Sequence, residues 1–428
     1  MSAKESTMKS ITIKVISATV ISIAAVLPPS DGAEQKKIQV GIIHSLTGTM
    51  AVVETGLVEA EMMAIAEINA TGGIRINNQQ YLIQPILRDA GSIWQEYTQQ
   101  ANDLINRNKV AALFGGWTSA SRKAMLPVVE AKDHLLFYPI SYEGQECSRN
   151  IFYTGATPNQ QSEPAILFMH QQSPAAGKPF FLVGSDYVFP RTSHVITKEQ
   201  LKALGASVVG EQYLPLGNIE VGAIIEMIKA SMPNGGVIIN HFNGDQNVAF
   251  FRELRANNLT PDNGYYVMSF TLLGPELELI GHNYLAGHYV SWNYMMSDQS
   301  RSSQTFIRSF QQRYGAERWL TDPQESAYTM VYLWKKAVEK AQSFDPAKVR
   351  QALVGVTFQA PQGKVEVMPN HHLAQSARIA QITPTGSMRI VAESKSMVQP
   401  HAWSRYEPVM RGHACDWTDP SKGERYRF

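Results

Sequence analysis

Two short polar and aromatic segments contain the residues best suited to recognise a small molecule. The first is Trp117-Thr118-Ser119, and the second is Tyr138-Pro139-Ile140-Ser141-Tyr142. Each follows a strand-like apolar run, and one helix-like segment separates them within the interval Gly115 to Gly144. Because the carboxyl ends of neighbouring parallel strands open on one crevice, both segments are predicted to face the same ligand.

The elements that position these segments have an α/β pattern. From Ile38 onward, short apolar runs alternate with amphipathic segments, which is typical of β-α units on a parallel sheet. A second run of such units begins after the polar stretch 154–159, so the pattern predicts two doubly wound lobes. Strands are expected at 38–44, 81–88, 110–114, 134–138, 180–183, 207–214, 237–241 and 265–269.

The remaining elements are expected to complete these two lobes. The strand-like run Leu285 to Trp292 and the helical region Pro323 to Ala341 are assigned to the first lobe, since no flexible linker separates them from it. Short strands near 364–368, 377–383 and 388–392 suit the second lobe. From Lys395 the chain is polar and aromatic, and we expect a tail packed on the surface.

Composition excludes two kinds of partner. The chain has 428 residues, enough for about two domains with substantial cores, and 44% of them are hydrophobic. Lys and Arg number 38 against 37 for Asp and Glu, so no basic field exists to hold nucleic acid or an anionic membrane.

The N-terminus has the pattern of a signal peptide. Lys4, Lys9 and Lys14 precede an apolar run from Val15 to Leu27, which is shorter than the roughly 20 residues of a spanning helix. Cleavage after Gly32 or Ala33 would remove residues 1–33 and leave an exported protein, periplasmic in a bacterium. A buried helix or an uncleaved anchor is the alternative.

Two cysteines are present, Cys147 and Cys415. An oxidising compartment permits a disulfide between them, which would tie the C-terminal tail to the first lobe. Two isolated buried thiols are the alternative, and the spacing of the cysteines does not decide between them.

Several motifs in order along the chain carry a family resemblance. They are Ser45-Leu46-Thr47-Gly48, Trp117-Thr118-Ser119 with Ser121-Arg122-Lys123, Tyr138-Pro139 with Tyr142-Glu143-Gly144, Tyr153 to Gln160, Gly184-Ser185-Asp186-Tyr187 with Phe189-Pro190-Arg191, Ala360-Pro361-Gln362-Gly363, and Asn370-His371-His372. On these residues the chain resembles the type I periplasmic substrate-binding proteins, and within them the urea and short-chain amide branch.

The resemblance implies two α/β lobes of doubly wound parallel sheet, joined by a three-crossover hinge that closes on a ligand. The crossovers are expected near 154–158, 287–289 and 358–361. The first lobe would then comprise residues 38–155 plus 288–357, and the second residues 158–287 plus 360–393. Residues 394–428 would form the surface tail.

The resemblance also implies a set of ligand-binding residues. On the first lobe they are Ser45, Trp117, Thr118, Ser119, Tyr138, Pro139, Ile140 and Ser141, and on the second they are Tyr187 and Phe189. Asn243 and Asp245 follow another second-lobe strand, and from that position they are also predicted to approach the cleft. Urea and small amides are planar and uncharged, so they need hydrogen bonds to the carbonyl and NH₂ groups and aromatic walls. Thr118 and Ser119, at the start of a helix, suit the ligand carbonyl.

Other interpretations of these residues stay open. The alternative role of Trp117 and Tyr138 is to cap the sheet, and that of Tyr187 is to be an ordinary aromatic residue at a strand end. Asp245 suits a helix N-cap as well as a cleft. Phe189 stands where an amide-binding relative has Tyr, and Gly116 where relatives carry Cys, so the sequence does not fix the substrate.

The predicted function is therefore a periplasmic solute-binding protein that captures urea or a short-chain amide and delivers it to an ABC permease in the inner membrane. It is expected to be a monomer without cofactor or metal. An amide-sensing regulatory receptor and a branched-chain amino acid binding protein are alternatives of the same fold. An amidohydrolase is not favoured, because no Gly-x-Ser-x-Gly elbow is present and His134 begins its strand, away from the cleft. The histidines lack zinc-ligand spacing.

Overall fold

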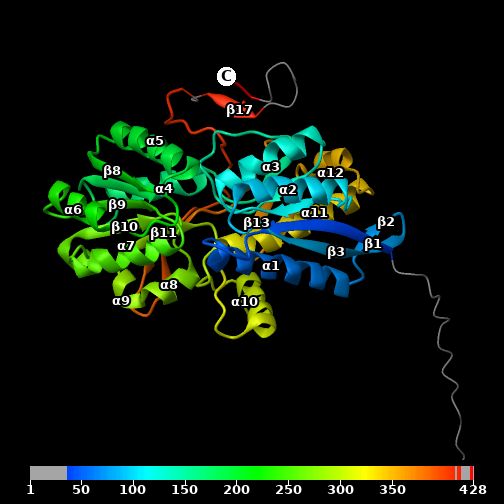
Figure 1. The fold of residues 1–428 in the computed structure, drawn as a ribbon, viewed down its shortest axis with the longest axis horizontal. Coiled ribbons are helices and arrows are strands. Elements are labelled where there is room, and N and C mark those ends of the chain that lie inside the picture. Colours follow the sequence, from blue (N-terminus) through cyan, green and yellow to red (C-terminus); the bar gives the residue numbers. More distant parts are fainter. Residues whose placement is uncertain (1–35, 410–411, 416–424, 428) are drawn as a thin grey trace, which may run out of the picture. The chain divides into compact units, whose positions relative to one another are not determined.

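The computed structural model describes residues 36–409, 412–415 and 425–427, and the predicted signal peptide lies outside them. The first sheet has the strand order β2-β3-β1-β4-β5-β6 and is parallel except for β2. Its elements are β1 (Lys36–His44), α1 (Ala51–Ala70), β2 (Ile74–Ile76), β3 (Gln79–Asp89), α2 (Trp94–Asn106), β4 (Leu113–Gly115), α3 (Ser119–Ala131), β5 (Leu136–Tyr138) and β6 (Ile151–Tyr153) (Figure 1).

The second sheet has the order β16-β15-β11-β10-β9-β7-β8. Strands β7 to β11 pair in parallel, whereas β15 and β16 join antiparallel. Its elements are η1 (Pro158–Gln160), α4 (Ser162–Gln171), β7 (Phe180–Ser185), α5 (Val188–Ala203), β8 (Val208–Leu214), α6 (Gly222–Ser231), β9 (Gly236–His241), α7 (Asp245–Ala256), η2 (Pro261–Asn263), β10 (Tyr265–Ser269), α8 (Gly274–Ile280), α9 (His282–Leu285), β11 (Tyr289–Trp292), β15 (Arg378–Ile382) and β16 (Met388–Glu393). The predicted α/β class with two wound sheets is confirmed.

A third group of elements returns to the first sheet. Helix α11 packs along α1, and Figure 1 shows both running beside that sheet. The ring of Tyr332 on α11 stacks on Phe358 of a small three-stranded sheet, with 5.0 Å between centroids. The elements are α10 (Arg301–Tyr314), α11 (Asp322–Ala341), α12 (Pro346–Leu353), β12 (Thr357–Ala360), β13 (Gly363–Val367) and β14 (Leu373–Ala374).

Two strands lie elsewhere than predicted. Strand β11, expected to complete the first lobe, pairs with β10 and β15 in the second sheet. Strand β13, expected in the second lobe, pairs with β12 and β14, and His372 bridges to Tyr153 at the end of β6. The chain therefore crosses between the sheets after Trp292 and after Ala374, not at 287–289 and 358–361. Short strands buried on both faces carry no local signal of which sheet they join.

A row of aromatic side chains holds the first sheet to its helices. Phe114, Phe137 and Phe152 come from β4, β5 and β6, and their ring centroids are 5.2 and 5.4 Å apart. Trp334 of α11 meets Phe114 edge-on at 5.8 Å. All four are almost fully buried. Burying rings of this size is a large share of the hydrophobic stabilisation, and it fixes the ends of three strands that each have only three residues.

The C-terminal tail is tied to the body of the protein by a disulfide between Cys147 and Cys415. The backbone N–H of Gln145 donates to the Ala402 carbonyl at 2.5 Å, and the Ser404 hydroxyl donates to Glu163 on α4 at 2.8 Å. Strand β17 (His413–Cys415) pairs with β18 (Arg425–Arg427). The sequence left two alternatives for these cysteines, a disulfide or two free thiols, and the structure contains the disulfide.

Candidate functional site

The loop between β4 and α3 makes a sharp turn that only glycine accommodates. Gly115 and Gly116 have φ values of +132° and +83°, and a Cβ on Gly115 would lie 2.0 Å from the Ile43 carbonyl oxygen. Thr118 then caps α3, because its hydroxyl accepts the Ser121 N–H at 2.9 Å. The turn sets Trp117 and Ser119 at the carboxyl end of the sheet, as the sequence predicted.

These residues line a small cavity together with residues that follow strands of the second sheet. The space open to the centre of a water molecule is about 10 Å³, which leaves room for about one water. The lining residues are Trp117, Ser119, Tyr138, Ile140, Ser141, Tyr187, Phe189, Asn243, Phe270, Thr271 and Trp292. Six of them are aromatic, and none carries a charge.

The first-lobe wall is backed by a buried ionic network. The Arg122 guanidinium is 0% exposed and donates to Glu146 at 2.8 Å, to Glu143 at 3.3 Å and to the Ser119 hydroxyl oxygen at 3.0 Å. It also lies over the rings of Tyr138 and Tyr142, 4.8 and 4.5 Å from their centroids. Because Glu143 and Glu146 both pair with Arg122, its charge is compensated within the protein and does not attract an anionic ligand.

Ionisation within this network is set by the competition between burial and charge. Burial alone would raise the pKa of Glu146, but the cations Arg122 and Lys123 outweigh it and lower that pKa to about 2. The neighbouring carboxylates raise the pKa of Arg122 further, against the opposing effect of burial. Arg122 and Glu146 therefore keep their charges throughout the physiological pH range.

The second-lobe wall rests on neutral groups. The Asn243 amide donates to the His241 carbonyl at 3.2 Å and to the Tyr187 hydroxyl oxygen at 3.3 Å. Phe189 packs edge-on against the ring of His241 at 5.2 Å, and His241 lies 3.2 Å from His194 through their ring nitrogens. Burial is the main cause that lowers the pKa of both histidines, so both are neutral at pH 7.

Counting hydrogens shows which groups remain for a ligand. The Ser119 hydroxyl donates to Glu143 at 2.5 Å, the Tyr138 hydroxyl donates to the Trp117 carbonyl, also at 2.5 Å, and the Thr271 hydroxyl donates to the Phe242 carbonyl. The His241 carbonyl can only accept a hydrogen bond, so the NH₂ group of Asn243 points toward it. The side-chain oxygen of Asn243 then remains available to accept from a ligand. Ser119, Thr271 and Asn243 can therefore only accept from a ligand.

Donors are fewer in this cavity. The Tyr187 hydroxyl accepts from Asn243, and its own hydrogen has no acceptor among the described residues. The Ser141 hydroxyl likewise makes no hydrogen bond to the described residues. This reverses one expectation: Ser119 was predicted to use its hydroxyl toward a ligand carbonyl, but Glu143 takes that hydrogen. A cavity with three acceptors and two hydroxyl donors matches a molecule rich in N–H groups.

Eight of the predicted site residues line the cavity, and four do not. The Thr118 hydroxyl caps helix α3. The hydroxyl of Ser45, in the loop after β1, bonds to the hydroxyl of Tyr97 on α2 at 2.9 Å. Asp245 is exposed as the first residue of α7, and Pro139 does not line the cavity. These four positions follow strand ends as the others do, but their side chains point elsewhere, which spacing alone does not reveal.

Three lining residues were missed by the sequence analysis. Phe270 and Thr271 directly follow the predicted strand 265–269, so the rule that singled out the other loops would have found them. Trp292 ends β11, which had been assigned to the first lobe. Its indole N–H donates to the Leu272 carbonyl at 3.0 Å.

The serines and histidines considered for catalysis bond to other groups in the described residues. In the described residues, the hydroxyls of Ser119 and Ser121 donate to Glu143 and to the Thr118 carbonyl, not to a histidine. His134 bonds to the Val110 carbonyl at 2.8 Å, and His372 bonds to Tyr142 at 2.6 Å. No group of three or more His, Cys, Asp or Glu in residues 36–409, 412–415 and 425–427 is arranged to hold a metal ion. Within the same ranges, no helix is both long and apolar enough to cross a membrane.

Comparison with known families gives a match over most of the chain. Residues 38–409 match the family described as periplasmic binding protein domain. A Leu/Ile/Val-binding protein homolog 7 of Brucella melitensis biotype 1 is 21% identical over 353 residues, 79% of this chain and 86% of that protein. A limonene hydroxylase of Geobacillus stearothermophilus is 28% identical over 130 residues, 30% of this chain, and the chain spans only 22% of that relative.

Solved structures share the fold. A solute-binding protein of an ABC transporter from R. palustris, in complex with 4-hydroxybenzoate, has a TM-score of 0.75 at 22% identity, covering 85% of this chain and 98% of that one. A leucine-binding protein from Thermotoga maritima has a TM-score of 0.72 at 17% identity, covering 83% and 98%. None of these relatives is named for urea or an amide, so the resemblance to that branch remains a prediction.

Proposed function

Because the chain belongs to the periplasmic binding protein domain family, we propose that it is a solute-binding protein of an ABC transporter that encloses urea or a short-chain aliphatic amide. In this proposal residues 1–33 direct export to the periplasm. The ligand binds in the cavity between Trp117 and Tyr187, and the closed form is recognised by a permease. A ligand stabilises that form only through its greater affinity for it.

The observation that carries this proposal is the uncharged, acceptor-rich lining of the cavity. Urea has four N–H groups and one carbonyl, which complements acceptors at Ser119, Asn243 and Thr271 and a donor at Tyr187. The backbone N–H groups of Ser119 and Ala120 begin α3 and also favour a carbonyl oxygen.

Aromatic and amino acids are the competing ligands, because relatives of the same fold are named for 4-hydroxybenzoate and leucine. A carboxylate leaves its water only for strong donors or a cation. The nearest cation to the cavity, Arg122, is already paired with Glu143 and Glu146. This neutralised arginine favours an uncharged ligand over either acid.

Calorimetric titration of the mature protein tests the proposal. Urea, formamide and acetamide are compared with leucine and 4-hydroxybenzoate. We expect saturable binding of at least one of the first three and none of the last two. Tight binding of leucine or 4-hydroxybenzoate without any of the amides would show that the proposed ligand class is wrong. Release of ammonia from bound urea or acetamide would instead favour a hydrolase.

A further inference from the structure

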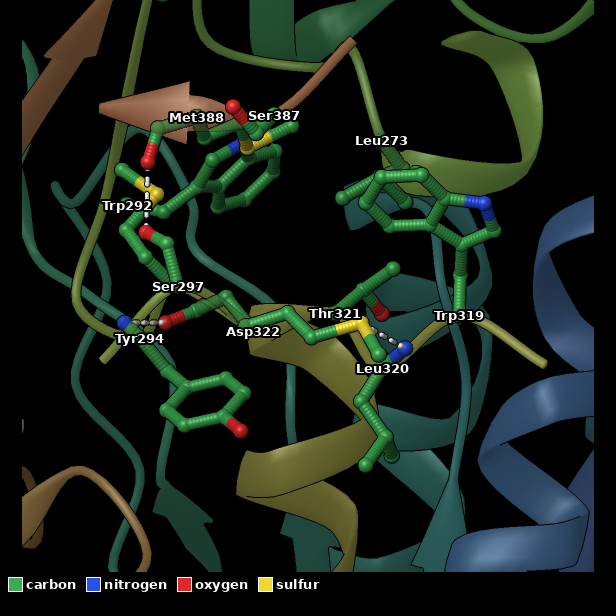
Figure 2. Close-up of a pocket in the computed structure, with 13 residues that line it drawn as sticks. Leu273, Trp292, Tyr294, Ser297, Trp319, Leu320, Thr321, Asp322, Ser387 and Met388 are labelled. Atoms are coloured by element: carbon green, nitrogen blue, oxygen red, sulfur yellow. Dashed lines mark hydrogen bonds between the residues drawn. The ribbon is translucent and has the colours of Figure 1, made fainter. Parts of the chain in front are cut away.

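A second pocket lies where the chain leaves β11 for α10 (Figure 2). Its space for the centre of a water molecule is about 210 Å³, against about 10 Å³ for the cavity between Trp117 and Tyr187. The two share only Trp292. An engineered apolar cavity of about 150 Å³ holds benzene. The second pocket therefore has room for one aromatic ring with a short substituent.

Its walls come from residues at and beside the strand ends of the second sheet, from the segment after β11, and from the loop that leads into α11. Trp319 stands in the loop before α11, and its ring packs where Gly274 begins α8. A Cβ added to Gly274 would lie 2.7 Å from that ring. The Trp319 indole N–H donates to Glu278 at 3.2 Å. Figure 2 shows the indoles of Trp292 and Trp319 on different walls of the pocket, with Asp322 below them in that view.

Asp322 is the charged group of this otherwise largely apolar pocket. Its side chain is 3% exposed, and one carboxylate oxygen, Oδ1, accepts the backbone N–H groups of Asn293 at 2.9 Å and Tyr294 at 2.7 Å. The other oxygen, Oδ2, has no hydrogen-bond partner among the described residues. Oδ2 is not one of the fully enclosed side-chain atoms, so it is open to a donor that enters the pocket, and that donor gains a strong charge-assisted bond.

The charges around Asp322 favour a cation. Arg378 is the nearest positive group, but it bonds to Glu393 at 2.7 Å and pairs with Asp298 at 3.2 Å. Glu325 bonds to Thr329 and Gln362. Burial raises the pKa of Asp322 to about 7 and that of Glu325 to about 8. Above pH 8 the surroundings of the pocket are therefore negative.

We propose that this pocket is a second binding site, for a small organic ammonium ion that carries one apolar ring. The ammonium group donates to Oδ2 of Asp322, and the ring lies between the indoles of Trp292 and Trp319. Indole faces attract a desolvated cation, and thioethers adapt to the ring of a ligand. The sulfur-containing wall consists of Met295, Met296 and Met388. The inference does not depend on which solute binds between the lobes.

Titration with benzylamine tests this site. At pH 8.5, above the pKa of Asp322, we expect saturable binding at one site and quenching of tryptophan fluorescence. Benzyl alcohol, which has the same ring without the charge, should bind at least about tenfold more weakly, since a charged hydrogen bond exceeds a neutral one by roughly that factor. Absence of benzylamine binding, or equal affinity for the alcohol, would overturn the proposal.

Variants locate the binding. Asp322→Asn keeps one oxygen for the two backbone N–H groups but removes the charge, and it should lower benzylamine affinity at least about tenfold. Asp103→Asn removes a charge from the exposed face of α2 and should change nothing. Met296→Trp fills the pocket from a half-buried position and should abolish binding, which decides the question if Asp322→Asn does not fold. Circular dichroism confirms folding of each variant.

The cavity between the lobes provides the remaining control. Phe189→Ala enlarges that cavity without touching the second pocket. Unchanged benzylamine affinity in this variant supports the proposal. If Phe189→Ala changes the affinity for benzylamine and Asp322→Asn does not, benzylamine binds between the lobes and the proposal is wrong.

Discussion

His44 and His241 occupy similar places in the two sheets, but their surroundings are opposite. Each ends a buried strand, β1 in the first sheet and β9 in the second. His44 lies between carboxylates, 2.9 Å from Glu61 and 3.2 Å from Glu54. His241 lies against His194 and two aromatic rings. Burial lowers the pKa of both, yet the carboxylates raise that of His44 to about 9.

The same contrast holds for the two walls of the candidate site. The first-lobe wall depends on the Arg122 ion network, and the second on neutral bonds among Asn243, Tyr187 and Ser185. Removing one member of a buried ion network leaves an uncompensated buried charge, which strongly lowers the free energy of unfolding. Removing one neutral hydrogen bond lowers that free energy much less. We therefore expect changes in the first wall to affect stability and changes in the second to affect affinity.

The largest expected effect follows loss of Arg122. Arg122→Met leaves Glu143 and Glu146 buried without their cation, which should lower the free energy of unfolding by about 3–5 kcal/mol. Urea denaturation of the purified protein would interfere with the proposed ligand, so guanidinium chloride is the denaturant to use. Arg107→Met, at an arginine side chain that is 80% exposed, is the matched control and should change stability little. Equal effects of the two variants would contradict the assigned role of the network.

The two histidines predict opposite pH dependence. A raised pKa at His44 stabilises the fold below pH 6.5, and on the order of 3 kcal/mol is lost as the pH rises to 9. The lowered pKa of His241 removes stability as the pH falls below 6.5, because the unfolded chain then binds the proton more readily. Unfolding free energies measured from pH 5 to 9.5 check both. His44→Gln should reduce the pH dependence of the unfolding free energy only on the alkaline side. His241→Gln should reduce it only on the acid side.

A smaller effect is expected at the donor of the second wall. Tyr187→Phe removes the hydroxyl hydrogen assigned to the ligand carbonyl and should weaken urea binding about fivefold to tenfold, with little change in stability. Tyr138→Phe removes a hydroxyl whose hydrogen is held by Trp117, so affinity should change less. Calorimetry on both variants compares them directly. A greater loss of affinity at Tyr138 would reverse the assignment of donors.

The smallest effect is expected at Asp245. This carboxylate is exposed at the start of α7 and does not line the cavity. Asp245→Asn should therefore change the dissociation constant for urea by less than about twofold, since isolated exposed charges contribute little. A large change in affinity would show that Asp245 approaches the ligand, as the sequence had suggested.

The sequence was sufficient for much of the candidate site because the signal was local. Apolar runs that end in polar and aromatic residues marked Trp117, Tyr138 and Tyr187 as loop residues at strand ends, and the geometry of a parallel sheet brings such ends together. The same rule applied to the strand 265–269 would have added Phe270 and Thr271. The sequence does not show where a side chain points, so Ser45 and Asp245 were predicted as ligand-binding residues although they do not line the cavity.

By itself, the sequence determined the α/β class with wound parallel sheets and marked the loops at the strand ends, because periodicity and turn residues act over a few positions. Only the tertiary structure decided that β11 joins the second sheet and that Cys147 meets Cys415. It also decided that Glu143 holds the Ser119 hydrogen and that Asp322 faces a pocket. These features depend on contacts between residues far apart in the chain, where partner choice follows packing and hydrogen-bond geometry and not local pattern.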